Sequence, residues 1–324
     1  MGKALGHLAA ISAVLLAVAL ALQQDDSARL VVASTQAGAV ASPMLVGQAQ
    51  AGDREYFVNK RQFVPLGSST IRLPILMYHY IRTPPSMRVD LLGYKLSVAP
   101  DVFQSQMDWL YVNGYHPVTF NQVRAYFAGA QPLPSKPVVI TLDDGYSDLY
   151  TAAFPILRAH GFTAVAYIVS SFVDQYAYAT RSQILEMDRA GIEIASHTVH
   201  HANLAGMSYG GAMFELVQSK QWLEQLVGHR VVDFAYPSGK YNSQTVQAVE
   251  QAGYNTAVTE QVSITHSYSD RYLWTRVRVG GGESLEDFVA GLGPSMDTVT
   301  VINVNIEVPA APTVARERRL RSDV

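Results

Sequence analysis

The stretch VVITLDDG at positions 138–145 is an apolar, β-branched run that ends in two adjacent carboxylates and a glycine. A short apolar run that stops at a turn signal predicts a buried strand, here Val138 to Leu142. Asp143 and Asp144 repel each other and a buried carboxylate needs a partner, so a polyvalent cation is the simplest explanation. An Asp-Gly turn with two solvated carboxylates is the plain alternative. The rest of the sequence decides between them.

The composition excludes several classes of protein. The chain has 324 residues, 48% of them hydrophobic and 16% charged, which supports one large domain or two small ones. A formal net charge of −3 gives no electrostatic case for nucleic-acid binding. Cysteine is absent, which excludes a thiol enzyme, a cysteine zinc site and a disulfide framework. The nine histidines are therefore the candidate soft ligands.

Both ends of the chain differ from its middle. Lys3 precedes an uncharged apolar run from Leu8 to Leu22, so residues 1–22 are predicted to be a signal peptide or a membrane anchor. Residues 23–70 are rich in Gln, Ala, Ser and Gly and are predicted to be a linker. Residues 293–324 are predicted to form an edge strand and a solvated, Arg-rich tail. We therefore expect an exported protein that is extracellular, on the cell surface or anchored facing outward. If the N-terminal segment is not cleaved, we expect it to associate the protein with the membrane.

Strand and helix candidates alternate between residues 71 and 292. The expected strands are 73–79, 138–142, 163–169, 192–196, 231–236, 256–259 and 275–279. Seven strands in this order predict an α/β fold with a parallel sheet, closed as a barrel. In such folds the site gathers at the C-terminal ends of the strands, which is where the conspicuous polar residues of this chain fall.

A second signal follows the strand that ends at Ser196. His197 and His201, in SHTVHH at 196–201, are four residues apart, so one helical turn or a compact loop brings both imidazoles to one side. Two histidines and one carboxylate are a common divalent-metal set that leaves positions open for water and substrate. Three solvated loop histidines are the alternative. His200 would face elsewhere on a helix and is not included.

A third signal, FAYPSGKYN at 234–242, again lies at a strand end. Pro237 and Gly239 fix an unusual backbone turn, which can aim an N–H group at a developing oxyanion. As a bare sequence, an ordinary strand-to-helix turn is the plainer interpretation.

These motifs together resemble those of the polysaccharide deacetylases, carbohydrate esterase family 4. TLDDG at 141–145 resembles the family's TFDDG motif, and HTVHH at 197–201 matches its His-Ser/Thr-x-x-His motif. FAYPSG at 234–239 is similar to the third motif of the branch that acts on poly-β-1,6-N-acetylglucosamine. The resemblance runs from about Leu73 to Leu292. It implies a distorted (β/α)7 barrel of the NodB-homology type, a bound divalent metal and hydrolysis of N-acetyl groups on glycans.

The resemblance also implies residue roles. Asp144, His197 and His201 would hold the metal, most suitably Zn²⁺, with Co²⁺ and Ni²⁺ also suited to the set. Asp143 would be the general base toward an attacking water whose pKa the metal lowers. The backbone N–H of Ser238 would help to stabilise the oxyanion.

The general acid departs from the commonest family pattern, which places a histidine near the C-terminus. No histidine follows His266, which lies in an irregular Ser/Thr-rich stretch. ILMYH at 75–79 resembles the missing motif moved to the first strand, similar to the circularly permuted poly-N-acetylglucosamine deacetylase branch. His79 is therefore assigned as general acid. A satisfied core histidine is the alternative.

The arginine that orients the base is displaced as well. Ala235 stands where the common third motif has it, and WTRVRV at 274–279 resembles the strand that supplies it in the permuted branch. Arg276 is the predicted partner of Asp143. Arg278 lies on the same strand face by period two, so the register between the two is open. A salt bridge on an ordinary strand is the alternative.

Four aromatic residues, Tyr146, Tyr236, Tyr241 and Trp274, could stack on sugar rings, although aromatics near strand ends more often serve packing. The sequence thus predicts a metal-dependent N-deacetylase of a poly-N-acetylglucosamine-like glycan, with peptidoglycan or chitin oligomers as neighbouring substrates. A catalytically inactive glycan-binding module on the same fold is the alternative. Asp143 and His79 argue against it, because a pure binder needs neither a base nor an acid.

Overall fold

The computed structural model describes residues 63–64 and 70–293. The predicted export segment over 1–22, most of the predicted linker and the predicted edge strand and tail lie outside these residues. Within residues 70–293, no helix combines the length and the hydropathy that crossing a bilayer requires.

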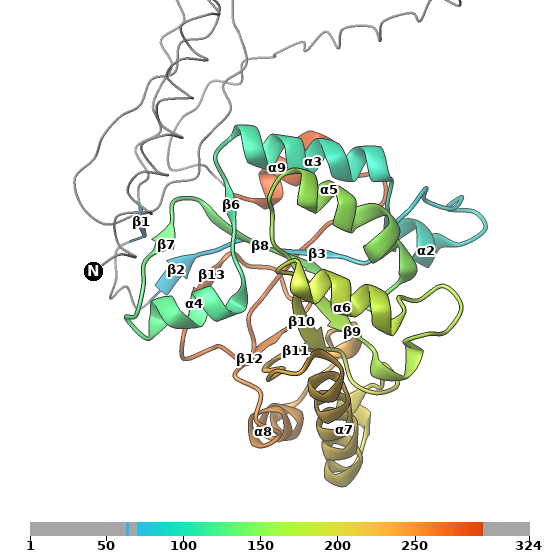
Figure 1. The fold of residues 1–324 in the computed structure, drawn as a ribbon, viewed down its shortest axis with the longest axis vertical. Helices are drawn as coiled ribbons and strands as arrows, with labels where there is room; N and C mark the ends of the chain where they lie inside the picture. The colour runs from blue at the N-terminus through green and yellow to red at the C-terminus, as the bar shows by residue number, and fades with distance from the viewer. Residues whose placement is uncertain (1–62, 65–69, 294–324) are drawn as a thin grey trace, which may run out of the picture. The chain divides into compact units, whose positions relative to one another are not determined.

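The central, curved sheet (Figure 1) has eight strands, seven in one parallel path and an eighth, β6 (His116–Pro117), that pairs with β8. The order of the seven in space is β12-β11-β10-β9-β8-β3-β14, and every neighbouring pair along this path is parallel. Each of the seven lies within one of the seven predicted strand ranges apart from a small shift at its ends, so the predicted α/β fold with a parallel sheet is confirmed. The seven strands are β3 (Ile75–Tyr78), β8 (Pro137–Leu142), β9 (Val165–Ile168), β10 (Glu193–Ser196), β11 (Asp233–Ala235), β12 (Thr256–Val258) and β14 (Val277–Arg278).

The two ends of this path also meet. The segment that leads into β14 runs parallel to β12, with a bridge between Val258 and Trp274. Trp274 N donates to Ala257 O at 3.1 Å, and Thr259 N donates to Trp274 O at 2.8 Å. The sheet is therefore closed through this segment, as expected for the distorted (β/α)7 barrel.

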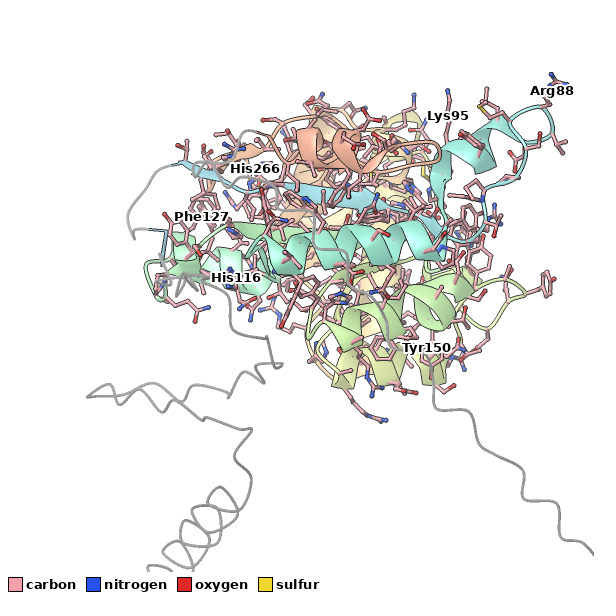
Figure 2. All side chains as sticks on the ribbon, turned by 90° about the horizontal axis from the view of Figure 1, so that it is seen from above. Arg88, Lys95, His116, Phe127, Tyr150 and His266 are labelled. Carbon is pink, nitrogen blue, oxygen red and sulfur yellow. The ribbon has the colours of Figure 1, made fainter. Side chains whose placement is uncertain are left out.

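Shorter strands extend the ends of the barrel. β2 (Thr70–Arg72) pairs antiparallel with β13 (Thr265–Ser267), and β4 (Tyr80–Ile81) pairs parallel with β5 (Ser97–Val98). β1 (Phe63–Val64) pairs with β7 (Leu133–Pro134), so part of the range predicted as linker takes part in strand pairing. Figure 2 shows His266 of β13 at one end of the molecule and Arg88, which follows β4, at the other.

Helices connect the strands and cover the outside of the sheet (Figure 1). Four of them begin with a capping box, at Thr119, Thr180, Asn242 and Ser284, as their sequences favour. The helices are α2 (Leu91–Leu96), α3 (Pro100–Val112), α4 (Phe120–Phe127), α5 (Phe154–Ala159), α6 (Arg181–Arg189), α7 (Tyr209–Val227), α8 (Ser243–Gln251) and α9 (Leu285–Gly291). Short 3-10 turns are η2 (Ser170–Phe172), η3 (Leu204–Gly206) and η4 (Pro237–Gly239).

The helical segment between β8 and β9 is not a single regular helix. It begins as a π-helical turn, η1 (Leu149–Ala153), and continues as α5. Pro155 has no N–H to donate to the carbonyl of Thr151 four residues earlier, so a regular α-helix cannot run through this point.

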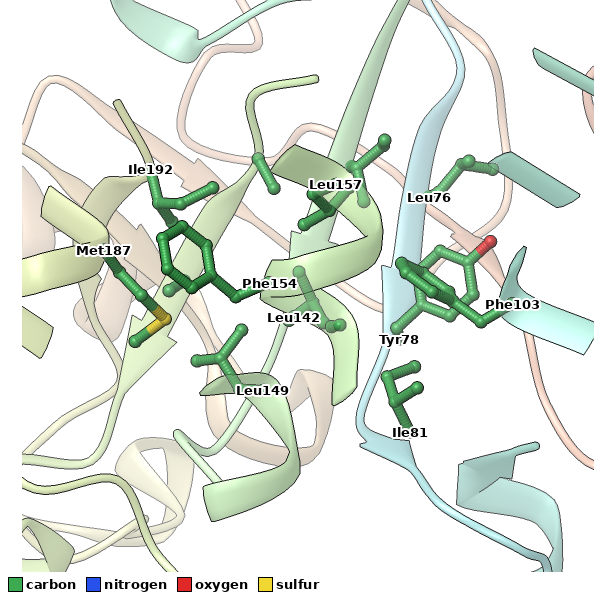
Figure 3. Packing of buried hydrophobic residues seen from close by; sticks show 14 of the residues in the cluster. Leu76, Tyr78, Ile81, Phe103, Leu142, Leu149, Phe154, Leu157, Met187 and Ile192 are labelled. Atoms are coloured by element: carbon green, nitrogen blue, oxygen red, sulfur yellow. The ribbon is translucent and has the colours of Figure 1, made fainter. Parts of the chain in front are cut away.

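Apolar side chains fill two layers, because successive strand residues point to opposite sides of the sheet. The outer layer lies between strands and helices: Phe154 and Leu157 of α5 pack near Leu142 of β8 (Figure 3). The inner layer includes Ile75 of β3 and Val139 of β8. The same alternation places Thr141 and Asp143 on the inner side at the strand's C-terminal end.

Candidate active site

Asp144, His197 and His201 converge where β8 and β10 end. The Nε2 atom of His197 lies 3.4 Å from Asp144 Oδ1, and that of His201 lies 3.3 Å from the same oxygen. One ligand atom from each residue lies within 4.8 Å of the others. Among the residues that the structure describes, no other group of three acidic or histidine side chains is arranged in this way. The predicted metal ligands are thus brought together, and by a compact loop rather than a helical turn.

The donor atoms of this triad fit a divalent cation. His197 Nδ1 bonds to Ala235 O at 2.8 Å, which places the proton on Nδ1 and leaves the Nε2 lone pair facing Asp144. Asp144 Oδ1 is buried and has no hydrogen-bond partner among the described residues. Imidazole lone pairs that face a bare carboxylate oxygen are complementary only to positive charge. Two imidazoles and one carboxylate suit Zn²⁺ and leave positions open.

Electrostatics around the triad point the same way. Burial raises the pKa of the Asp144 carboxyl, but the adjacent imidazole of His197 outweighs it and holds the pKa well below its ordinary value. Burial lowers the pKa of His197, and the nearby carboxylates of Asp144 and Asp143 more than offset this, so the pKa is raised. Burial lowers the pKa of His201. The carboxylate of Asp144 therefore stays ionised and favours positive charge beside it.

The backbone around the triad is strained. Non-glycine residues with positive φ cost about 1–2 kcal/mol each, and such residues cluster at functional sites. Three lie in the two ligand loops, and a fourth lies in the turn after β11: Asp144 (φ 72°), Thr198 (φ 68°), His201 (φ 54°) and Ser238 (φ 53°). The surrounding contacts must hold these loops in place.

Asp143 is paired with Arg276 inside the barrel. Arg276 Nη1 donates to Asp143 Oδ1 at 2.7 Å, and Nη2 donates to Oδ2 at 2.8 Å. Nη1 also donates to Thr141 Oγ1 at 3.0 Å. Burial raises the pKa of Asp143, but the charge and hydrogen bonds of Arg276 outweigh it and hold this pKa below its usual value. Arg278, the other candidate, bonds instead to Glu260 at 2.5 Å.

His79, at the end of β3, lies beside the same carboxylate. Its Nε2 atom is 3.9 Å from Asp143 Oδ2, and its side chain is 8% exposed. Its buried Nδ1 atom has no hydrogen-bond partner among the described residues. Burial lowers the pKa of His79, although the nearby carboxylates of Asp143 and Asp144 oppose this. An imidazole with no bonded partner beside a carboxylate is free to exchange a proton.

The structure corrects the prediction that Tyr236 and Trp274 stack on sugar rings. Both side chains are 0% exposed. Trp274 packs against Phe120 and donates its indole N–H to Ser267 O at 2.9 Å. Tyr236 belongs to a buried cluster with Phe234. Neither ring face can reach a glycan, and both residues serve the core.

The remaining predicted residues lie at the rim. Ser238 is exposed in the turn η4 that follows β11, and Tyr241 is half-buried with its ring centroid 5.2 Å from that of Tyr236. Two functional neighbours were missed from the sequence. Thr141 could have been found, because period two places it on the same face as Asp143. Glu215 on α7, which contacts the His197–His201 loop, gives no sequence signal beyond an acid within an apolar helix.

Comparisons with known proteins bear on this site. A family model described as polysaccharide deacetylase matches residues 130–257. A protein of Bacillus subtilis (strain 168), “Putative polysaccharide deacetylase YxkH”, is 32% identical over 219 residues, which cover 68% of this chain and 75% of that protein. The chain belongs to the polysaccharide deacetylase family. The predicted family and its enzyme class, a hydrolytic polysaccharide N-deacetylase, are confirmed.

Other relatives cover different shares of their own length. The poly-beta-1,6-N-acetyl-D-glucosamine N-deacetylase of Escherichia coli (strain K12) is 28% identical over 236 residues, 60% of this chain but only 35% of that protein. The Streptococcus pyogenes deacetylase PplD in complex with acetate superposes with a TM-score of 0.64 at 27% identity, covering 69% of this chain and 99% of that one. IcaB from Ammonifex degensii superposes with a TM-score of 0.57 at 23% identity, covering 68% and 96%, which supports the fold alone.

Proposed function

We propose that this polysaccharide deacetylase removes N-acetyl groups from a poly-N-acetylglucosamine-like glycan outside the cell, with a divalent metal, Zn²⁺ favoured over Co²⁺ or Ni²⁺. One arrangement carries the proposal: the ion-paired carboxylate of Asp143 lies beside the imidazole of His79 and directly precedes Asp144 of the triad that suits a metal. The names of the Escherichia coli relative and of similar Staphylococcus aureus proteins, poly-beta-1,6-N-acetyl-D-glucosamine N-deacetylases, support this choice of glycan.

Asp143 is the proposed general base. A low pKa keeps its carboxylate ionised near neutral pH, and the two bonds from Arg276 fix both of its oxygens. Asp143 takes the proton of the attacking water as the new C–O bond forms at the acetyl carbon. A divalent metal held by Asp144, His197 and His201 would polarise the acetyl carbonyl and lower the pKa of the attacking water.

His79 is the proposed general acid. Breaking the C–N bond releases an amine, whose nitrogen needs a proton as the acetate departs. Protonated His79 supplies it, and its place 3.9 Å from Asp143 lets the proton taken from water return by this route. The backbone N–H of Ser238 is proposed to stabilise the oxyanion. Base and acid flank the same reacting centre, which argues against a purely binding role.

The setting of the domain is part of the proposal. Residues 71–292 form the catalytic domain, residues 1–22 export or anchor it, and residues 23–70 link the two. Tyr146 and Tyr241, both half-buried, are the predicted aromatic residues left to contact the glycan. Nucleic acid is not among the proposed partners, in keeping with the net charge of −3.

The experiment is acetate release by the purified protein. The substrates are poly-β-1,6-N-acetylglucosamine, chitin oligomers and peptidoglycan, each with chelator, with Zn²⁺ and with Co²⁺. We expect metal-dependent acetate, with poly-β-1,6-N-acetylglucosamine the best substrate. Faster acetate release from chitin oligomers or peptidoglycan would change the assigned substrate and leave the assigned deacetylation reaction in place. If none of them releases acetate although each protein chain binds one metal ion, the glycan-binding module is favoured instead.

A further inference from the structure

The loop that carries His197 and His201 needs external support. Thr198 and His201 both have positive φ, at 68° and 54°. For a β-branched residue such as Thr198 this conformation is an outlier, and it persists only where contacts over-determine it. The contacts that hold this loop therefore decide where the two imidazoles lie.

Glu215 provides such contacts from helix α7. Glu215 is buried, with 4% of the residue exposed. Its Oε2 atom accepts hydrogen bonds from Val199 N and His200 N, both at 2.9 Å, and its Oε1 atom bonds to His200 Nδ1 at 2.7 Å. Successive backbone N–H groups in a turn form a concavity for an anion, and here the carboxylate of Glu215 fills it.

The opposite side of the loop is held as well. Ser170 N donates to Thr198 O at 3.1 Å, and Ser171 N donates to Val199 O at 3.0 Å. The peptide groups between the two histidines are thus fixed from both sides, by η2 through their carbonyls and by Glu215 through their N–H groups. Without Glu215, those two N–H groups would lose their acceptor and the strained turn would lose its support from helix α7.

The imidazole of His200 contributes less than the backbone bonds. Its side chain is 59% exposed, so its contact with Glu215 is screened by solvent. Within the residues that the structure describes, Glu215 has no hydrogen bond or ion pair with the side chains of Asp144, His197 or His201. It therefore has no direct part in metal binding. Its influence on them runs through the loop backbone.

We propose that Glu215 is a positioning residue, whose carboxylate holds the backbone of the 197–201 loop and thereby sets where His197 and His201 present their Nε2 atoms to a divalent metal. The inference rests on the metal site of the proposed function. Glu215 lies outside that site and sets the affinity and the geometry with which the site binds a metal.

The test compares Glu215→Leu with Glu215→Gln. Leucine fills the buried volume but accepts no hydrogen bond, whereas the glutamine carbonyl can still accept from both N–H groups. The readouts are the affinities for Zn²⁺ and Co²⁺ by chelator competition and the visible spectrum of bound Co²⁺. We expect E215L to bind about 10–100-fold more weakly, as loss of groups that orient ligands does, with an altered Co²⁺ spectrum. E215Q should stay near wild type.

Glu224→Leu is the matched control. Glu224 lies on the same helix and also accepts a backbone N–H, from Val231 at 3.0 Å, as well as a bond from Lys220 at 2.9 Å. Val231 precedes β11, so this contact lies at the start of the strands, whereas the triad lies at their C-terminal ends. E224L should lower the melting temperature and leave metal affinity and the Co²⁺ spectrum unchanged. A loss of affinity that follows the melting temperature in both leucine variants would overturn the proposal.

The remaining outcomes are also decisive. Wild-type affinity and spectrum in E215L would overturn the role of Glu215 and leave the proposed metal site standing. A loss of affinity of about 10-fold or more in E215Q would overturn the backbone bonds as the cause, and this criterion holds even if E215L does not fold. If the wild-type protein binds no metal, the proposed metal site fails and this inference fails with it.

Discussion

Arg276 and Asp143 meet through two parallel hydrogen bonds, Nη1 to Oδ1 at 2.7 Å and Nη2 to Oδ2 at 2.8 Å, with both side chains almost fully buried. Removing two charges from water costs about as much as their attraction returns, so a buried pair is weak evidence of selection for stability. Such a pair does fix the orientation of the carboxylate. Because this carboxylate lies beside His79 and directly precedes Asp144 of the metal-suited triad, we infer that the pair serves to orient it.

Breaking this pair should be far more costly than breaking its neighbour. Arg276→Met leaves Asp143 buried without a partner, and we expect a loss of about 3–5 kcal/mol in the free energy of unfolding. Arg278→Met breaks the ion pair between Arg278 and Glu260, whose side chains are 37% and 27% exposed. This change should lower the free energy of unfolding by at most about 1 kcal/mol. Urea unfolding of both variants measures this. Similar losses in the two would contradict the assignment of Arg276 as the buried partner.

Asp143→Asn separates chemistry from metal binding. The amide keeps the shape of the side chain but cannot take a proton, so we expect kcat for acetate release to fall by about 10²–10⁴-fold. Metal content should stay near wild type, because Asp143 is not a ligand of the proposed triad. Asp144→Asn is the comparison, and there metal affinity itself should fall. Unchanged turnover in D143N would remove the base from its role.

His79→Gln tests proton delivery to the leaving group. With a glycan amide as substrate, kcat should fall by about 10²–10⁴-fold, since an unprotonated amine is a poor leaving group. 4-Nitrophenyl acetate releases a stable phenolate that needs no proton, so its hydrolysis should fall by less than about 10-fold. D143N should impair both substrates. Equal losses for amide and ester in H79Q would show that His79 acts at another step.

The barrel could be predicted from the sequence because its signals are local. Short β-branched runs alternate with amphipathic segments, and the polar residues stand directly after the runs. The parallel order then brings Asp143, Asp144, His197 and His79 to one end. Two histidines four residues apart could have met on a helix or in a loop. Only the positive φ values of Thr198 and His201 separate the two.

Arg276 was correctly predicted to pair with Asp143, but the sequence left the register between Arg276 and Arg278 open, because it does not show how deep in the barrel a residue lies. Arg276 and Arg278 share a strand face by period two, yet one lies fully inside and the other reaches the partly exposed Glu260. Strand-end aromatics such as Trp274 carry no sign of which way they point, and this one closes the sheet against β12. Glu215 is distant in sequence from Asp144, and its bonds to Val199 N and His200 N go to backbone atoms that leave no mark on side-chain identity.

His266 predicts an acid sensitivity away from the site. The side chain is 1% exposed on β13, and one ring nitrogen bonds to Leu73 O at 3.1 Å. Burial lowers its pKa from 6.5 to about 4. The unfolded chain therefore binds more protons between these pH values, so the stabilising contribution is complete above about pH 6.5 and is lost as the pH falls toward about 4.

The expected size of this loss is about 2–3 kcal/mol in the free energy of unfolding between pH 7 and pH 4.5. Urea unfolding at the two pH values measures it, with His266→Gln as the comparison, because glutamine keeps a hydrogen-bond donor but does not titrate. Other groups that titrate in this range contribute equally to both proteins. The wild type should therefore lose more stability than H266Q on acidification, and parallel losses in the two would show that His266 becomes protonated without unfolding the surrounding structure.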